Sequence, residues 1–218
     1  MNLKGFTDPG VLRRFIILMA LLTFGGFTFW AVTGSYIQTP QGDYEVRRGD
    51  IFLGDGEYDA ALERFNLALK KSPDHRGALM GRGLVFLLDE RYTEAEVEFT
   101  YLIKYLEVNL EPNDITGIAV HAAAYANRGT MYNRMGCQPG GASAHFEKAF
   151  ADYVQALKID EGAIDGPNLI ERVIYGTPRP STIRLRAVYM QKQLALPESK
   201  RLLCLPEKDS EQRMYKPY

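Results

Sequence analysis

The most restrictive feature of this sequence is a residue pattern that recurs after 34 positions. Two sets of residues share this offset: Gly49, Phe52, Tyr58, Ala61 and Phe65 recur as Gly83, Phe86, Tyr92, Ala95 and Phe99. A period of this length is typical of helix–turn–helix units, each of which has an apolar face that it cannot bury alone. The chain is therefore predicted to be all-α, with about three such units stacked into a solenoid.

The first predicted unit covers residues 43–76. We expect its first helix over about 44–53 and its second over 58–70, where apolar residues recur at helical spacing. Pro73 cannot continue a helix and ends the unit. Gly49 lacks a side chain, so that the two helices can approach each other closely.

The second and third units are predicted at 77–110 and 118–161. The third is stretched, because Gly129 and Ala149 are separated by eight residues more than Gly49 and Ala61 of the first unit. Another insertion, around 111–117, separates the second and third units. Insertions in repeat arrays usually form loops on one face, and we expect the same here.

With these residues, the chain resembles the tetratricopeptide repeat family over about 43–161. It departs from the family pattern at Glu45 and Arg48, where the family usually has bulky apolar residues, and at Glu107, where a closing proline is usual. The early residues of the first unit are therefore expected to be partly solvated or to face a membrane.

The resemblance also implies a binding surface. In the family, the first helix of each unit lines a concave groove that holds an extended or helical peptide. Alignment with the family assigns to this groove Val46, Asp50, Leu53, Met80, Leu84, Leu87, Asn127, Thr130, Asn133 and Arg134. Its middle part is apolar and its third part is polar, which suits an amphipathic segment. The alternative, that Met80, Leu84 and Leu87 pack against neighbouring helices, stays open. Recognition of a terminal carboxylate is not expected, because only Asn127 and Arg134 resemble the family's basic clamp.

Residues after the third unit are predicted to close the solenoid. Two capping helices are expected within 162–196, at 167–175 and 182–194, with a break at the sequence TPRPS between them. The last residues, 197–218, are charged and contain several prolines, so that an extended tail is predicted.

An apolar segment precedes the repeats. Its 23 residues, 15–37, carry no charge and would span about 34 Å as a helix, enough to cross a bilayer core. Residues 1–14 would then form a short segment on the cytoplasmic side. Gly25 and Gly26, with Phe27 and Trp30, are candidates for docking against another membrane helix. A cleaved signal peptide is the competing interpretation, although Ala31-Val32-Thr33 is a poor cleavage site.

The charges that flank this segment favour one orientation. Lys4, Arg13 and Arg14 precede it, whereas Arg47 and Arg48 follow it among acidic residues. Positive residues accumulate on the cytoplasmic side, so we expect a single-pass protein whose repeats lie outside, in the periplasm of a bacterial inner membrane.

Composition and single residues exclude several functions. The net charge of −1 does not favour nucleic-acid binding. No catalytic constellation, metal site or cofactor motif is found, so an enzyme is not expected. The two cysteines, Cys137 and Cys204, are either a disulfide or two unrelated surface thiols, and the sequence does not decide between these.

These observations predict a non-enzymatic, membrane-anchored adaptor that binds another protein, as an accessory subunit or assembly factor of a membrane complex. The alternative is a chaperone-like biogenesis factor that transiently holds secreted or periplasmic chains.

Overall fold

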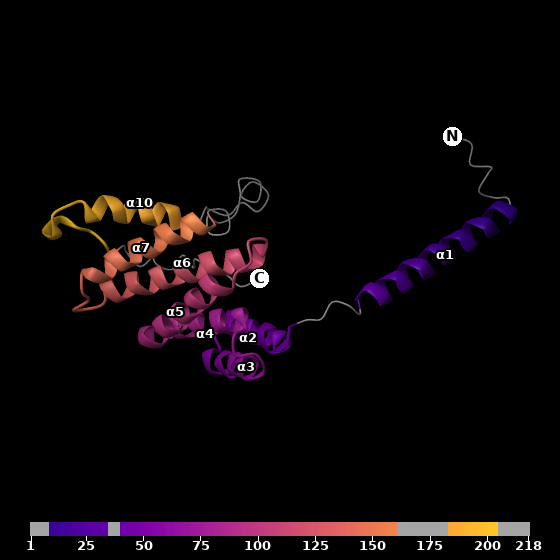
Figure 1. Cartoon of the computed structure of the whole chain (residues 1–218), viewed down its shortest axis with the longest axis horizontal. Helices are drawn as coiled ribbons and strands as arrows, with labels where there is room; N and C mark the ends of the chain where they lie inside the picture. The colour runs from indigo at the N-terminus through magenta and orange to yellow at the C-terminus, as the bar shows by residue number, and fades with distance from the viewer. Residues whose placement is uncertain (1–8, 35–39, 161–182, 205–218) are drawn as a thin grey trace. The chain divides into compact units, whose positions relative to one another are not determined.

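The computed structural model of the 218-residue chain describes residues 9–34, 40–160 and 183–204. The chain divides into two compact units, Met1–Pro40 and Gln41–Tyr218, each of which is described by itself (Figure 1). All regular structure in the described ranges is helical, as the repeat pattern predicts.

The first unit consists of helix α1 (Pro9–Gly34). Its residues Pro9–Val32 have a mean hydropathy of 2.1, and no part of the described protein covers them. Large apolar side chains such as Leu21 and Phe24 are about two-thirds exposed. The hydroxyls of Thr23 and Thr28 donate hydrogen bonds to carbonyls of the preceding turn, so that neither needs water. The helix starts before the predicted residue 15, because Pro9 suits a helix start and Arg13 and Arg14 continue the helix readily.

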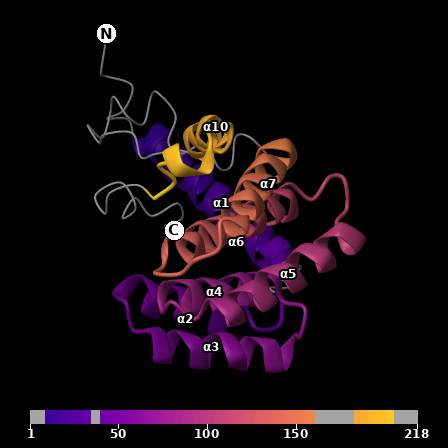
Figure 2. The same cartoon turned by 90° about the vertical axis from the view of Figure 1, so that its left-hand side faces the viewer.

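The second unit contains three consecutive antiparallel hairpins. The helices are α2 (Asp43–Asp55), α3 (Tyr58–Lys71), α4 (Arg76–Leu88), α5 (Tyr92–Asn109), α6 (Ile115–Cys137) and α7 (Ala144–Ile159). Each helix contacts the next one in the chain, and α4 also contacts both α2 and α6. Figures 1 and 2 show them stacked in chain order, with α2 and α3 at one end and α7 at the other. This is the predicted solenoid.

In each hairpin an aromatic ring packs on a glycine of the partner helix. A Cβ built on Gly49 would lie 2.6 Å from the Phe65 ring, one on Gly83 2.7 Å from the Phe99 ring, and one on Gly129 2.8 Å from the Tyr153 ring. The three rings are fully buried. The third pair is separated by eight residues more than the other two, which confirms the register predicted for the stretched unit.

Buried ion pairs accompany these contacts. Arg82 of α4 donates to Glu98 of α5 at 2.7 Å and to Asn66 of α3 at 2.9 Å. Arg128 of α6 likewise makes two 2.8 Å bonds to Asp152 of α7 and one of 3.1 Å to Thr100 of α5. Each arginine therefore joins its own hairpin to the preceding one. These charged bonds pay for part of the desolvation that burial of the arginines requires.

The insertions differ from the expected loops. The loop between α6 and α7 consists of residues 138–143, whereas the loop between α2 and α3 in the first hairpin consists only of residues 56–57. In addition, α6 is longer than α2, and α7 is longer than α3. Half of the eight extra residues are therefore helical. Helix α6 begins at Ile115 rather than near residue 118, because the Asp114 carboxylate accepts a 2.7 Å hydrogen bond from the Gly117 amide and caps the helix.

The end of the solenoid is covered by α10 (Ile183–Leu194), which contacts α7. The other predicted capping helix, 167–175, lies outside the described residues. Beyond α10 the chain forms the 3₁₀ turn η2 (Glu198–Lys200), within the segment that was predicted to be an extended tail. Pro197 precedes this turn and its carbonyl accepts from the Lys200 amide at 2.8 Å.

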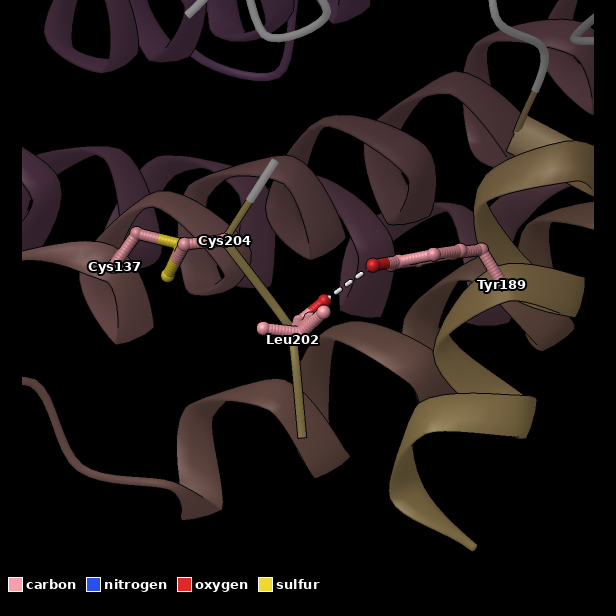
Figure 3. The surroundings of a disulfide bond; sticks show 4 residues. All are labelled: Cys137, Tyr189, Leu202 and Cys204. Carbon is pink, nitrogen blue, oxygen red and sulfur yellow. Dashed lines mark hydrogen bonds between the residues drawn. A yellow bond between two sulfur atoms is a disulfide. The ribbon is translucent and has the colours of Figure 1, made fainter. Parts of the chain in front are cut away.

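The cysteines left open by the sequence form a disulfide. Cys137, the last residue of α6, is bonded to Cys204, with their Cα atoms 5.5 Å apart (Figure 3). The Tyr189 hydroxyl of α10 donates to the Leu202 carbonyl in the same segment. Residues 195–204, called here the C-terminal strap, are thereby fastened across the end of the third hairpin.

Two glycines of α2 provide a test of the ring contact. Gly49→Ala is expected to destabilise the protein by about 1–3 kcal/mol, because the new methyl group overlaps the Phe65 ring. Gly54→Ala, in the same helix, has open space around it and should be neutral or stabilising by up to about 1 kcal/mol. Denaturant unfolding in detergent measures both, and equal stability of the two variants would contradict the packing.

Candidate partner-binding surface

The surface predicted to bind a partner belongs to α2, α4 and α6, the first helices of the three hairpins. These helices are in contact in that order. The same position recurs on each of them, directly after the glycine that carries the aromatic ring: Asp50, Leu84 and Thr130. The repeat therefore aligns the predicted residues in rows across the three helices.

Most of these residues are buried. Of the ten predicted residues, those at most 9 % exposed are Val46, Leu53, Met80, Leu84, Leu87, Asn127 and Asn133. The remaining three, Asp50, Thr130 and Arg134, are partly exposed. An approaching partner would thus meet the polar residues first.

Several of the predicted residues hold the helices together. The Val46 side chain lies against Gly77 of α4. Between α4 and α6, the Asn127 amide donates to the Met80 sulfur at 3.6 Å, and the Arg134 guanidinium donates to the Leu87 carbonyl at 3.4 Å. Met80 and Leu87 therefore pack between helices of the chain, as the alternative interpretation of these residues proposed. Binding of a partner by the ten predicted residues stays a prediction.

Asp50 is the most unusual side chain of this surface. It is half-buried, and it makes no hydrogen bond or ion pair to any other residue that the structure describes. Burial raises the pKa of its carboxyl from 3.8 to about 6. A lysine or arginine of a partner would supply the missing charge and lower this pKa again.

Helix α6 contributes further hydrogen-bonding groups. The side-chain oxygen of Asn133 is buried and has no hydrogen-bond partner among the described residues. The Thr130 hydroxyl donates to the Ala126 carbonyl of its own helix at 2.9 Å and accepts a 3.4 Å bond from Tyr153. Of the two acceptors Asp50 and Asn133, only the half-buried Asp50 carboxylate is accessible to a partner, because the Asn133 oxygen is enclosed.

The residues predicted to dock in a membrane lie on α1. A Cβ built on Gly25 or Gly26 would meet no atom within 4 Å, so that this side of α1 is open to a second helix. The rings of Phe27 and Trp30 are neighbours, with centroids 6.0 Å apart. Their docking role is not tested by the geometry of a single helix and stays a prediction.

Sequence reasoning missed a pocket next to the disulfide. An open pocket of about 380 Å³ is lined by Gly136, Gly141, Ser143, Phe146, Glu198, Arg201, Leu202, Leu203 and Cys204. It lies between the α6–α7 loop and the C-terminal strap. The cysteine count was the one signal that could have pointed to it.

Within residues 9–34, 40–160 and 183–204, no three His, Cys, Asp or Glu side chains are arranged to hold a metal ion. Several acidic groups of the repeats are engaged in ion pairs, for example Glu45 with Lys71 at 3.0 Å. Lys71 and Arg64 lower the pKa of Glu45.

Comparison with protein families identifies the repeats. Residues 46–103 match the model of a family described as tetratricopeptide repeat. The match covers most of α2, then α3 and α4, and two-thirds of α5. No curated protein matches the sequence significantly.

The raised pKa of Asp50 gives a testable pH dependence. Because the folded state holds the proton more tightly than the unfolded chain, ionisation of Asp50 lowers stability as the pH rises from about 4 to about 6. Asp50→Asn should therefore stabilise the protein by about 1 kcal/mol near neutral pH, and the gain should vanish as the pH falls below about 4. Melting temperatures across this range measure the effect. Glu63→Gln, an exposed change of equal charge on α3, should show no such pH-dependent gain.

Proposed function

We propose that this chain, a tetratricopeptide repeat protein through residues 46–103, is an adaptor that α1 anchors in a membrane. Repeats of this family are typically non-catalytic modules that bind other proteins. The adaptor would hold its partner at the periplasmic surface of a bacterial inner membrane, as an accessory subunit or assembly factor of a membrane complex.

The observation that carries the proposal is the joining of an uncovered apolar helix to a repeat solenoid in one chain. The exposed apolar side chains of α1 need an apolar environment, and a bilayer provides it. Confinement to a membrane raises the effective concentration of the solenoid near partners in the same membrane. A signal sequence would meet the same criteria of length and composition, but it would not provide this confinement once removed.

The disulfide supports a location outside the cytoplasm. Disulfides persist in oxidising compartments such as the periplasm and are rare where thiol reductants act. Cys137 and Cys204 are both exposed, so that a reducing cytoplasm would have access to their bond. The same orientation is favoured by Arg13 and Arg14 at the start of α1.

The α2–α4–α6 surface is the proposed binding site. Its half-buried carboxylate, Asp50, favours a partner segment that brings a cation. The charge of Asp50 would contribute to the choice of partner.

The proposal is tested by purifying the tagged full-length chain in mild detergent and quantifying the co-purified proteins by mass spectrometry. One partner at constant stoichiometry is expected. Asp50→Lys should reduce its recovery about ten-fold or more, because the charge reversal repels a cation without breaking an ion pair within the chain.

The control for this experiment is Glu63→Lys, an equal charge reversal on the exposed side of α3. It should recover the partner as the unchanged protein does. Equal recovery with Asp50→Lys would reject the α2–α4–α6 surface as the binding site. Many secreted or unfolded proteins at low, variable ratios would instead favour the chaperone-like function.

Orientation has a separate test, in which thiols are trapped in acid and alkylated with a maleimide carrying polyethylene glycol. In bacterial cells the unchanged chain should gain mass only after reduction, because both cysteines are in the disulfide. Cys204→Ser should gain one label without reduction, which shows that the reagent reaches Cys137. Two labels on the unchanged chain before reduction would contradict a periplasmic location.

A further inference from the structure

The first helix of the solenoid has a face that no other part of the described protein covers. On α2, Tyr44 and Ile51 are 62 % and 63 % exposed, Arg47 is exposed and Arg48 is partly exposed. At 3.6 residues per turn these four side chains fall within about 100° of the helix circumference. The buried residues Val46, Gly49 and Leu53 lie on the opposite side. We call the four residues the outer face of α2.

The repeat explains why Arg48 belongs to this face. Arg48, Arg82 and Arg128 each precede the glycine of their hairpin. In the second and third hairpins, the residue before the packed aromatic ring is an acid, which holds the arginine. In the first hairpin this residue is Arg64, so that Arg48 has no acidic partner there.

Arg64 and Arg48 therefore take other positions. Arg64 bonds to Glu45 at 3.4 Å. The Arg48 guanidinium instead lies over the rings of Tyr44 and Phe52, 5.9 Å from each centroid, and bonds to the Tyr44 hydroxyl at 3.4 Å. Arg47 makes no hydrogen bond or ion pair in the described part of the chain. The first hairpin thus has two arginines, Arg47 and Arg48, at its surface, whereas the second and third hairpins hold the equivalents of Arg48 in ion pairs.

From this geometry we propose that the outer face of α2 binds the anionic surface of a lipid bilayer. Arginine attracts anionic headgroups, while tyrosine and isoleucine suit the boundary between headgroups and acyl chains. The inference rests on the proposed anchoring of the chain by α1.

The length of the connection allows this contact. Eight residues, 35–42, join α1 to α2, and a chain of this length reaches at most about 30 Å. With α1 in a bilayer, α2 is therefore always within reach of the headgroups. The short tether gives a high effective concentration, so that a face of only four side chains suffices.

The acidic residues of α2 are compatible with this contact. Asp43 bonds to His75 at 2.9 Å, Glu45 is paired with Lys71, and Asp50 is half-buried outside the outer face. Asp55 shares the outer face, but it is seven residues beyond Arg48, or about 10 Å along the helix, which is about one Debye length. The two arginines therefore determine the charge of the nearer end of the helix.

A fluorescent label on the outer face tests the proposal in the full-length chain. Ile51→Cys is labelled with an environment-sensitive dye, while the intact disulfide protects the native cysteines. The protein is reconstituted into vesicles of phosphatidylcholine, with or without phosphatidylglycerol. A blue shift is expected only with the anionic lipid, and it should weaken as salt is added.

Two matched controls define the site. Val97→Cys on α5, with 62 % exposure of the native side chain, should show no shift in either vesicle. Arg47→Ala with Arg48→Ala should lower the ratio of docked to free helix about 25-fold. Lys70→Ala with Lys104→Ala removes the same charge from exposed positions on α3 and α5 and should leave the shift unchanged.

The outcomes separate this inference from the proposed anchoring. Alkaline carbonate extraction first shows whether the chain stays in the vesicles, and loss from them would reject the anchor itself. A retained chain whose label at position 51 does not shift would overturn the lipid contact alone. A shift that needs no anionic lipid and grows with protein density would also overturn it, and would assign the face to a second copy of the chain.

Discussion

The solenoid depends on one recurring contact, in which an aromatic ring packs directly on a glycine backbone. Phe65 illustrates its importance, because its ring lies against Gly49 of its own hairpin and against Gly81 of the next one. A single side chain thereby fixes both the approach of paired helices and the stacking of successive hairpins. A larger residue at Gly81 would push α3 and α4 apart and so lengthen the hydrogen bond between Arg82 and Asn66. The ring contact and the polar bridge between successive hairpins are therefore coupled.

The ion pairs in turn show where one hairpin differs from the others. Arg82 and Arg128 each reach back to the preceding hairpin, a partner that the first hairpin does not have. Arg64 has replaced the acid in this hairpin, and Glu45 compensates on the same helix pair. Because Arg64 is paired with Glu45, the charges between α2 and α3 are balanced, while Arg48 is left without an acid and lies at the surface. Comparison of equivalent positions in the three hairpins therefore distinguishes arginines that hold the fold together, Arg82 and Arg128, from one that is free for another role, Arg48.

The repeat period predicted the helices and their packing because each ring–glycine contact joins two helices that are adjacent in the sequence. The α3 helix was expected at 58–70 and is found at Tyr58–Lys71, and the ring of Tyr153 was located in spite of the stretched unit. The disulfide was not predictable, since 67 residues separate its cysteines and no local pattern relates them. The insertions were misjudged because helix length depends on caps such as Asp114 as well as on periodicity. For the predicted partner surface, alignment assigned residues to α2, α4 and α6 but left open whether Met80 and Leu87 are buried, because their burial depends on how closely α4 and α6 approach.

The two ends of a solenoid need protection because their last helices lack a neighbour on one side. At one end, α10 covers α7 and the disulfide holds the C-terminal strap against the third hairpin. At the other end, no other helix of the described residues covers the outer face of α2, which carries two arginines between Tyr44 and Ile51 rather than the small polar residues of a solvated cap. The difference is understandable if the uncovered end is the one that the short tether keeps at a bilayer. A covalent cap and a lipid surface would then perform the same physical task at opposite ends, leaving the row of first helices between them for a protein partner.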